Sequence, residues 1–242
     1  MVMTEYKILE IFYDYVCPWC YFITECIEQL HREFEIDIRW TAFPLHPETP
    51  PEGKTLEALF ADKNVDFGKI MVLQKRVASR LGMPFGDCRT IYNNRLAQEL
   101  GKFAESKGRG HEFHKAVFRA YFVEGKNIGK TRVLVEVAES INLNGNEAQK
   151  IIQNRTYKEA TDLDCKRSRG LSITVVPAFL LNNQILVGAQ KYETLENFLL
   201  SNNVKRRKQK QISLQMEPGR NTAFQPGENG PSSYDEVPQQ FG

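Results

Sequence analysis

Two cysteines stand two residues apart near the start of the chain, in Cys17-Pro18-Trp19-Cys20. An apolar run precedes them and helical spacing follows, so we expect the motif at a strand-to-helix junction. A thiol there faces unpaired backbone N–H groups and the positive end of the helix dipole, and both stabilise a thiolate. Cys20 lies one turn further on, within disulfide reach. The spacing therefore predicts a redox dithiol, with Cys17 as the nucleophile and Cys20 as the resolving cysteine.

Two other interpretations of this pair are open from the sequence. A Cys-x-x-Cys motif is often half of a zinc site, which needs a second pair of Cys or His ligands. The remaining candidates are scattered without such spacing: Cys26, Cys88, Cys165, His31, His46, His111 and His114. We therefore expect no metal. The pair could also be two inert buried thiols, which its place before a helix argues against.

A second part of the predicted site lies far downstream, in Val175-Val176-Pro177-Ala178-Phe179. Proline inside a sheet removes a ladder hydrogen bond, so Pro177 belongs at the start of a strand or on an edge. A cis Val176–Pro177 bond would turn the backbone of Val176 towards the dithiol and leave its N–H and C=O free to pair with a substrate. Together with Pro18 and Trp19, Val176 and Pro177 form the predicted substrate-binding set.

Asp14 stands three residues before the first cysteine. An acid at this place could raise the pKa of a thiol or relay a proton during exchange. The alternative is a solvated carboxylate at the end of a strand. We keep Asp14 as a candidate proton relay.

Strands and helices can be assigned around these residues. Residues 7–13 are predicted as a short buried strand, and residues 35–45 alternate apolar and polar side chains, which is typical of a second strand. The helical spacing between them makes a βαβ unit, and hence a parallel strand pair with a right-handed crossover. Near the end, residues 178–181 and 184–187 are predicted to form a hairpin, followed by a helix over residues 192–200.

The long middle of the chain has helical spacing almost throughout. The predicted helices are residues 67–81, 90–106, 111–123, 131–140, 147–153 and 157–169. So much helix between two strands exceeds an ordinary crossover, so we expect an inserted helical subdomain. Beyond residue 201 the composition turns polar and rich in Pro, Gly, Gln, Asn and Ser, which predicts a disordered tail. We interpret the basic cluster in this tail, residues 205–210, as a solvated charge run.

Composition limits the classes of partner. The chain has 242 residues, 41% of them hydrophobic, and a formal net charge of +2. We therefore expect no nucleic-acid or membrane partner. The five cysteines are an odd number spread over a long chain, and the N-terminus lacks the pattern of a secretory signal. Both features favour a cytoplasmic protein with one special cysteine pair.

The order of these features resembles the DsbA-like thioredoxin superfamily, in particular its FrnE-like branch of cytoplasmic oxidoreductases. The features are the Cys-Pro-Trp-Cys motif after a first strand, a helical insertion, Gly170, Val176-Pro177-Ala178-Phe179, two strands, Gly188-Ala189 and a last helix. The resemblance spans residues 7 to 200. It implies an α/β, thioredoxin-like fold with an inserted all-helical subdomain, and a cis-proline at Pro177. The expected division is 1–54 and 156–200 for the thioredoxin-like domain, 55–155 for the insertion, and 201–242 for the tail.

The resemblance also implies a protein-disulfide oxidoreductase. Its substrates would be disulfide-containing proteins or small-molecule thiols, with the dithiol itself as electron carrier, a cellular reductant, and glutathione as a candidate co-substrate. A reducing cytosol favours the reductase or isomerase direction over net oxidation. Alternatives are a glutathione-dependent kappa-type transferase or 2-hydroxychromene-2-carboxylate isomerase, which usually carry serine where Cys17 stands, and a non-enzymatic, chaperone-like peptide-binding module. The oligomeric state is open.

Overall fold

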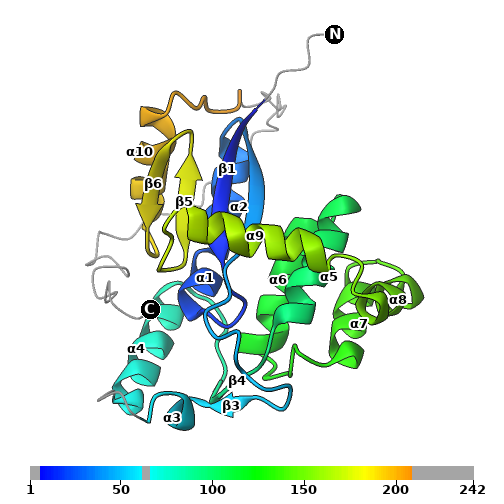
Figure 1. The fold of residues 1–242 in the computed structure, drawn as a ribbon. Coiled ribbons are helices and arrows are strands. Elements are labelled where there is room, and N and C mark those ends of the chain that lie inside the picture. The colour runs from blue at the N-terminus through cyan, green and yellow to red at the C-terminus, as the bar shows by residue number, and fades with distance from the viewer. Residues whose placement is uncertain (1–5, 62–65, 209–242) are drawn as a thin grey trace, which may run out of the picture.

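A four-stranded sheet lies in the upper part of the molecule as drawn in Figure 1, with helices from the middle of the chain below it. The computed structural model describes residues 6–61 and 66–208. The strand order is β2-β1-β5-β6, with bounds β1 Lys7–Tyr13, β2 Ile36–Ala42, β5 Ala178–Leu181 and β6 Gln184–Val187. β1 is parallel to β2 and antiparallel to β5, and β6 is antiparallel to β5. The predicted parallel pair and the predicted hairpin are both confirmed.

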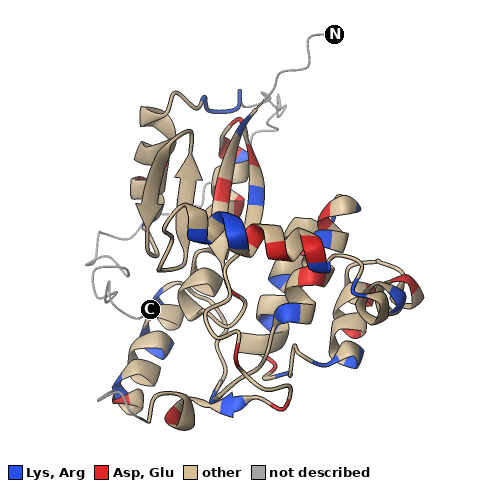
Figure 2. Cartoon of the chain, in the orientation of Figure 1, with Lys and Arg blue, Asp and Glu red and all other residues tan. Residues whose placement is uncertain are grey.

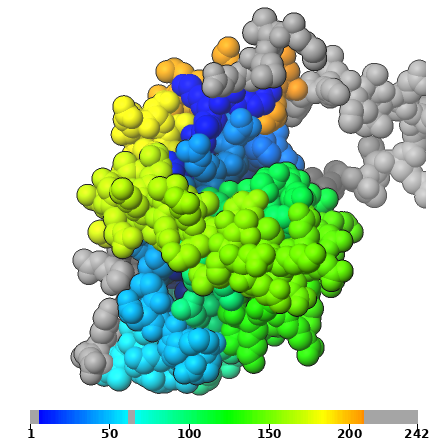
Figure 3. Space-filling view, turned by 45° about the vertical axis from the view of Figure 1, so that its right-hand side comes forward, coloured from blue at the N-terminus to red at the C-terminus, as the bar shows by residue number. Residues whose placement is uncertain are grey.

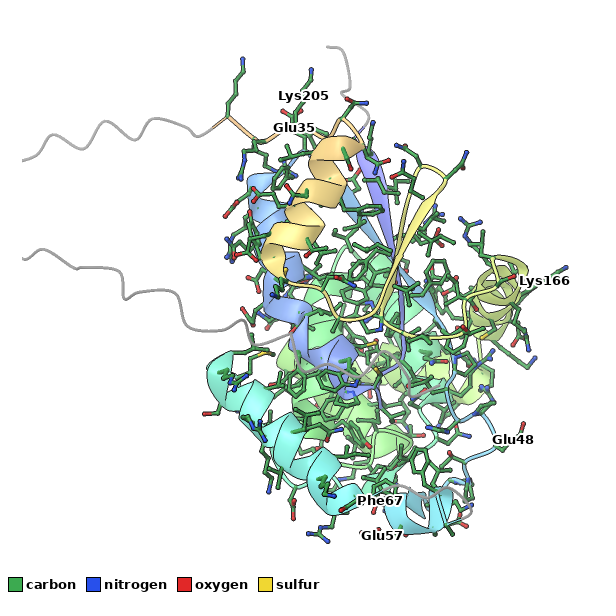
Figure 4. All side chains as sticks on the ribbon, turned by 90° about the vertical axis from the view of Figure 1, so that its left-hand side faces the viewer. Glu35, Glu48, Glu57, Phe67, Lys166 and Lys205 are labelled. Atoms are coloured by element: carbon green, nitrogen blue, oxygen red, sulfur yellow. The ribbon has the colours of Figure 1, made fainter. Side chains whose placement is uncertain are left out.

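Helices cover the two faces of this sheet. On one face lie α2 (Thr24–Glu33) and α10 (Tyr192–Ser201), and α9 (Lys158–Gly170) crosses the other (Figures 1 and 4). Because helices cover both faces of the sheet, the side chains of the central strand β1 from Leu9 to Tyr13 are buried on both faces. This explains why the strand is a nearly continuous apolar run rather than an alternating one.

The single helix predicted after the dithiol is two helices in the structure. α1 comprises Pro18–Phe22, Ile23 follows it as the C-cap, and α2 begins at Thr24. The hydroxyl of Thr24 donates to the backbone carbonyl of Tyr21 at 2.8 Å, which gives that carbonyl a partner outside the helical ladder. Cys26 therefore belongs to a different helix from Cys20, and it is buried in the core.

The helical insertion is confirmed, and it also contains two short strands. Its helices are α3 Leu56–Leu59, α4 Phe67–Arg80, α5 Arg95–Ser106, α6 Gly110–Phe122, α7 Thr131–Ser140 and α8 Gly145–Asn154. β3 (Lys54–Thr55) and β4 (Thr90–Ile91) pair antiparallel. The helix predicted from residue 90 begins only at Arg95 because Thr90 and Ile91 belong to this pair. The predicted domain boundaries remain a prediction.

α9 contacts both the sheet and the insertion. Its Arg167 donates to both carboxylate oxygens of Glu10 in β1, at 2.7 Å each. Its Asp164 accepts from Lys102 of α5 at 2.8 Å. In Figure 3, α9 lies in yellow-green between the yellow β5–β6 hairpin and the green helices of the insertion. None of the helices within residues 6–61 and 66–208 is long and apolar enough to cross a membrane.

The predicted disordered tail, 201–242, is wrong at its start. Val204 is buried, and the backbone N–H of Glu35 donates to the carbonyl of Lys205 at 2.8 Å. Glu35 and Lys205 lie side by side in Figure 4. Residues 202–208 thus form a strap against the start of β2, because Val204 provides one apolar anchor and the backbone provides hydrogen bonds. The rest of the predicted tail, 209–242, lies outside the described residues.

The two arginines of the predicted basic run have partners on the folded protein. Arg206 pairs with Glu33 at 2.9 Å, and its guanidinium carbon lies 4.7 Å from the centre of the Phe34 ring. Arg207 donates to the carbonyl of His31 at 3.2 Å. Sequence position alone could not show that the C-terminal end of α2 meets these arginines.

Candidate active site

The two cysteines lie where the sequence places them, at the start of α1. Cys17 has an extended backbone (φ −86°, ψ 113°) and precedes Pro18, the first helical residue. Its carbonyl accepts from the backbone N–H groups of Cys20 at 3.1 Å and Tyr21 at 3.2 Å. Both cysteines are thiols and both are buried. α1 has no charged side chain and is entirely tan in Figure 2.

The Val176-Pro177 segment meets the first cysteine across the fold. The Val176–Pro177 peptide bond is cis, which confirms that prediction. The Sγ of Cys17 donates to the carbonyl oxygen of Val176 at 3.4 Å. In the dithiol state this carbonyl thus already accepts one hydrogen bond, from the thiol, and the substrate-binding role of Val176 stays a prediction. Val176 itself is only 4% exposed.

Cys20 is the less solvent-exposed of the two thiols. Burial raises its pKa well above that of an ordinary cysteine, and the neighbouring Cys17 sulfur raises it further, while a backbone hydrogen bond at Asp14 acts in the opposite direction. The Cys20 sulfur therefore carries its proton at neutral pH. Any reaction in which Cys20 attacks a disulfide must first transfer that proton to an acceptor.

Asp14 is buried beside this thiol and is not the solvated carboxylate of the alternative interpretation. Its Oδ1 accepts from the backbone N–H of Val16 at 2.9 Å and from the side-chain amide of Asn94. Its Oδ2 accepts from the backbone N–H of Leu45 at 2.7 Å. Burial raises the pKa of Asp14 to about 6, against the opposing effect of these three uncharged donors.

Several polar contacts at this site were not predicted from the sequence. Asn94 and Leu45 belong to segments distant from Asp14 in sequence, and no local pattern marks them as its partners. A second buried contact joins the hydroxyl of Tyr15 to Nδ1 of His114 at 2.8 Å. Within residues 6–61 and 66–208, no group of three His, Cys, Asp or Glu side chains could hold a metal ion.

A pocket of about 320 Å³ opens at Cys17. Pro18 and Trp19, two of the predicted substrate-binding residues, line it, whereas Val176 and Pro177 are not among its lining residues. The rest of its lining comes from the loop after β2, from α3 and α4, and from β4. The insertion therefore forms one side of the space next to the reactive sulfur.

Comparisons with known proteins agree with this fold. The model of the DSBA-like thioredoxin domain matches residues 8–200, so the chain belongs to this family. An uncharacterized Bacillus subtilis protein, YwbO, is 27% identical over 194 residues, which cover 78% of this chain and 93% of YwbO.

Two solved structures have a similar fold. The probable DsbA oxidoreductase SCO1869 from Streptomyces coelicolor has a TM-score of 0.73 at 21% identity, covering 91% of this chain and 100% of that one. The cytosolic disulfide reductase DsbM from Pseudomonas aeruginosa has a TM-score of 0.62 at 21% identity, covering 80% of this chain and 99% of that one.

Proposed function

We propose that this protein is a thiol–disulfide oxidoreductase that works through Cys17 and Cys20 and acts mainly in the reductase or isomerase direction. The observation that carries the proposal is the position of the Cys17 sulfur, at the first turn of α1 with a pocket open to it. The family match supports disulfide chemistry in general.

Reduction would follow two exchange steps. The Cys17 thiolate attacks one sulfur of the substrate disulfide, a Cys17–substrate disulfide forms, and the other substrate sulfur leaves as a thiolate. Cys20 then attacks the Cys17 sulfur and releases the second substrate thiol. The substrate gains two electrons and two protons, and the dithiol becomes a Cys17–Cys20 disulfide. Asp14 is the proposed acceptor of the Cys20 proton, because it is buried beside Cys20 and has a pKa of about 6.

The oxidised dithiol must be returned to its reduced form by a cellular reductant, for which glutathione is one candidate. DsbM, described as a cytosolic disulfide reductase, supports the reductase direction and a cytoplasmic location for this chain. Substrates would be protein disulfides or small-molecule disulfides.

Two substitutions test the assignment of the cysteines. Cys17→Ser is expected to abolish reduction of a small disulfide such as 2-hydroxyethyl disulfide, because serine is no substitute nucleophile. Cys20→Ser is expected to stop after the first step and accumulate a mixed disulfide on Cys17, detectable by intact-mass spectrometry. Reductase activity that survives Cys17→Ser would refute the proposal, and aggregation suppression that persists in that variant would favour a binding module instead.

The reduction potential of the dithiol tests the direction. A value near that of thioredoxin, about −270 mV, is expected for a reductase. A value near about −120 mV would identify an oxidant and overturn the proposed direction.

A further inference from the structure

The pocket at Cys17 has an apolar wall with half-buried side chains. Phe67, Ile70 and Leu73 are three residues apart on α4, so they share one face of that helix, and all three line the pocket. Leu56 and Phe60, from α3 and its end, extend the wall. Each of the five is only partly buried by the protein itself. Their remaining apolar surface is available to a ligand.

The pocket lining also includes the reactive cysteine and more apolar groups. These are Val16 and Cys17 before α1, Trp19 of α1, Leu45 of the loop after β2, and Ile91 of β4. A substituent that occupies the pocket therefore lies next to Cys17. The pocket belongs to the same site as the dithiol.

The size and charge of the pocket limit what it can hold. A cavity of roughly 150 Å³ takes a benzene molecule, so about 320 Å³ has room for a substituent of one to two rings or a short alkyl chain. Among the described lining residues, Lys69 is the one with a permanent charge, and it already pairs with Asp66 at 3.4 Å. Glutathione carries two carboxylates and an ammonium group. The lining therefore suits an uncharged apolar substituent better than it suits the charged groups of glutathione.

From this geometry we infer that the pocket binds the apolar substituent of a small-molecule disulfide and places its sulfur against Cys17. The inference rests on the proposed oxidoreductase function and adds the substrate class. The Cys17 thiolate attacks the disulfide sulfur that carries the apolar group, and the second substrate sulfur leaves as a thiolate. Cys20 then displaces the apolar thiol, and the dithiol ends as a disulfide.

The experiment compares mixed disulfides of 2-mercaptoethanol with methanethiol, butanethiol and benzyl mercaptan. The reduced full-length protein reacts in a single turnover, so no external reductant is needed. Each rate constant is divided by the rate constant of dithiothreitol with the same disulfide, which corrects for the intrinsic reactivity of that disulfide. Each buried methylene is expected to raise the rate constant about threefold to fourfold, so the butyl compound, with three more methylenes, should exceed the methyl compound by roughly thirtyfold to sixtyfold. Oxidised glutathione should react no faster than the methyl compound.

Matched substitutions on α4 locate the effect. Ile70→Asn places a polar group in the wall and is expected to lower the butyl rate constant until it approaches that of the methyl compound. Val72→Asn is the control, because Val72 is 59% exposed on the same helix and does not line this pocket. If Ile70→Asn does not fold by circular dichroism, Leu73→Gln replaces it.

The outcomes separate the two proposals. Equal normalised rates for methyl and butyl compounds would overturn the apolar pocket and leave the oxidoreductase proposal standing. A preference that persists in the folded α4 variant would also overturn the pocket assignment. Failure of every disulfide to react would refute the proposed function itself.

Discussion

At the scale of single residues, two buried carboxylates near β1 differ in their partners. Glu10 meets the guanidinium of Arg167 and the hydroxyl of Thr41. Burial opposes ionisation of Glu10, yet the hydrogen bonds and charge of Arg167, with Thr41, hold its pKa below the usual value. Asp14 has only uncharged donors, so burial dominates and its pKa rises to about 6. A carboxylate with a pKa near physiological pH is suited to exchange protons, whereas the charged Glu10 is suited to hold Arg167 of α9 against β1.

The first prediction concerns Asp14 as proton acceptor for Cys20. Only the deprotonated carboxylate can accept the proton, so the rate of the resolving step should rise with pH with a midpoint near 6. Asp14→Asn is expected to remove this dependence and to slow the step at pH 7 by roughly a hundredfold. The measurement is stopped-flow release of the second thiol from a preformed Cys17 mixed disulfide.

Two further variants serve as references for that profile. Glu10→Gln alters a buried carboxylate that is paired with Arg167, and it should keep the midpoint near 6. Asn94→Ala removes a donor that lowers the pKa of Asp14, so the midpoint should move upwards. A profile in Asp14→Asn that matches the native one would show that another group accepts the proton.

Residue types and spacing within short segments were enough to predict that Cys17 and Cys20 lie at a strand-to-helix junction, whereas the cis bond at Pro177 followed from the family resemblance. Cys17, Cys20 and Pro177 each stand in a local pattern with a physical meaning. The burial of Asp14 was not predictable in this way, because its amide partners Leu45 and Asn94 come from distant segments that only the fold brings together.

At the scale of elements, periodicity predicted most of the strands and helices but not their interruptions. The break at Ile23 depends on a side-chain hydrogen bond from Thr24, and apolar spacing continues across it. α5 begins later than periodicity predicts because Thr90 and Ile91 pair with β3, a contact with a distant segment. Composition gave the wrong prediction of disorder for residues 202–208. This polar and basic segment is held in place by one buried valine and by partners on α2 and β2.

The second prediction tests this strap with two truncated chains. A chain ending at Ser201 should be less stable than a chain ending at Lys208 by about 2–3 kcal/mol, because it loses the burial of Val204 and the backbone bonds of Lys205 and Arg207. Urea unfolding monitored by circular dichroism measures the difference. Both chains lack residues 209–242, so the comparison isolates the strap. Equal midpoints would mean that the strap contributes nothing to stability.

At the scale of the whole molecule, α9 joins the sheet that carries the dithiol to the insertion that forms the pocket wall. Arg167 reaches β1, and Asp162 and Asp164 reach α5. The sequence predicted α9 as a polar helix of nearly the observed length. It gave no sign that the polar residues of α9 make these connections, because charged residues on a helix look the same whether they face water or a partner.

The third prediction concerns the Glu10–Arg167 pair. Arg167→Met keeps the aliphatic stem but leaves Glu10, whose side chain is 4% exposed, without its cation. Removing one partner of a fully buried pair costs about 3–5 kcal/mol and an exposed pair contributes about 0–1 kcal/mol. Arg167 is 45% exposed, so we expect a loss of about 2 kcal/mol at pH 7.

The pH dependence of that loss distinguishes the ion pair from simple packing. Because the folded-state pKa of Glu10 lies below its usual 4.5, the pair stabilises the protein above that pH, and the contribution is lost as pH falls through the lowered folded-state value. The variant, with burial no longer offset, should have a raised pKa at Glu10. The stability gap between the native protein and the variant should therefore narrow between pH 7 and pH 4 in urea unfolding.

Arg169→Met, on the same helix, is the control. It removes a bond to the Cys165 carbonyl and should show a smaller loss of stability that is independent of pH. A gap that is constant with pH in Arg167→Met would mean that α9 is held to the sheet by packing and not by this charge pair.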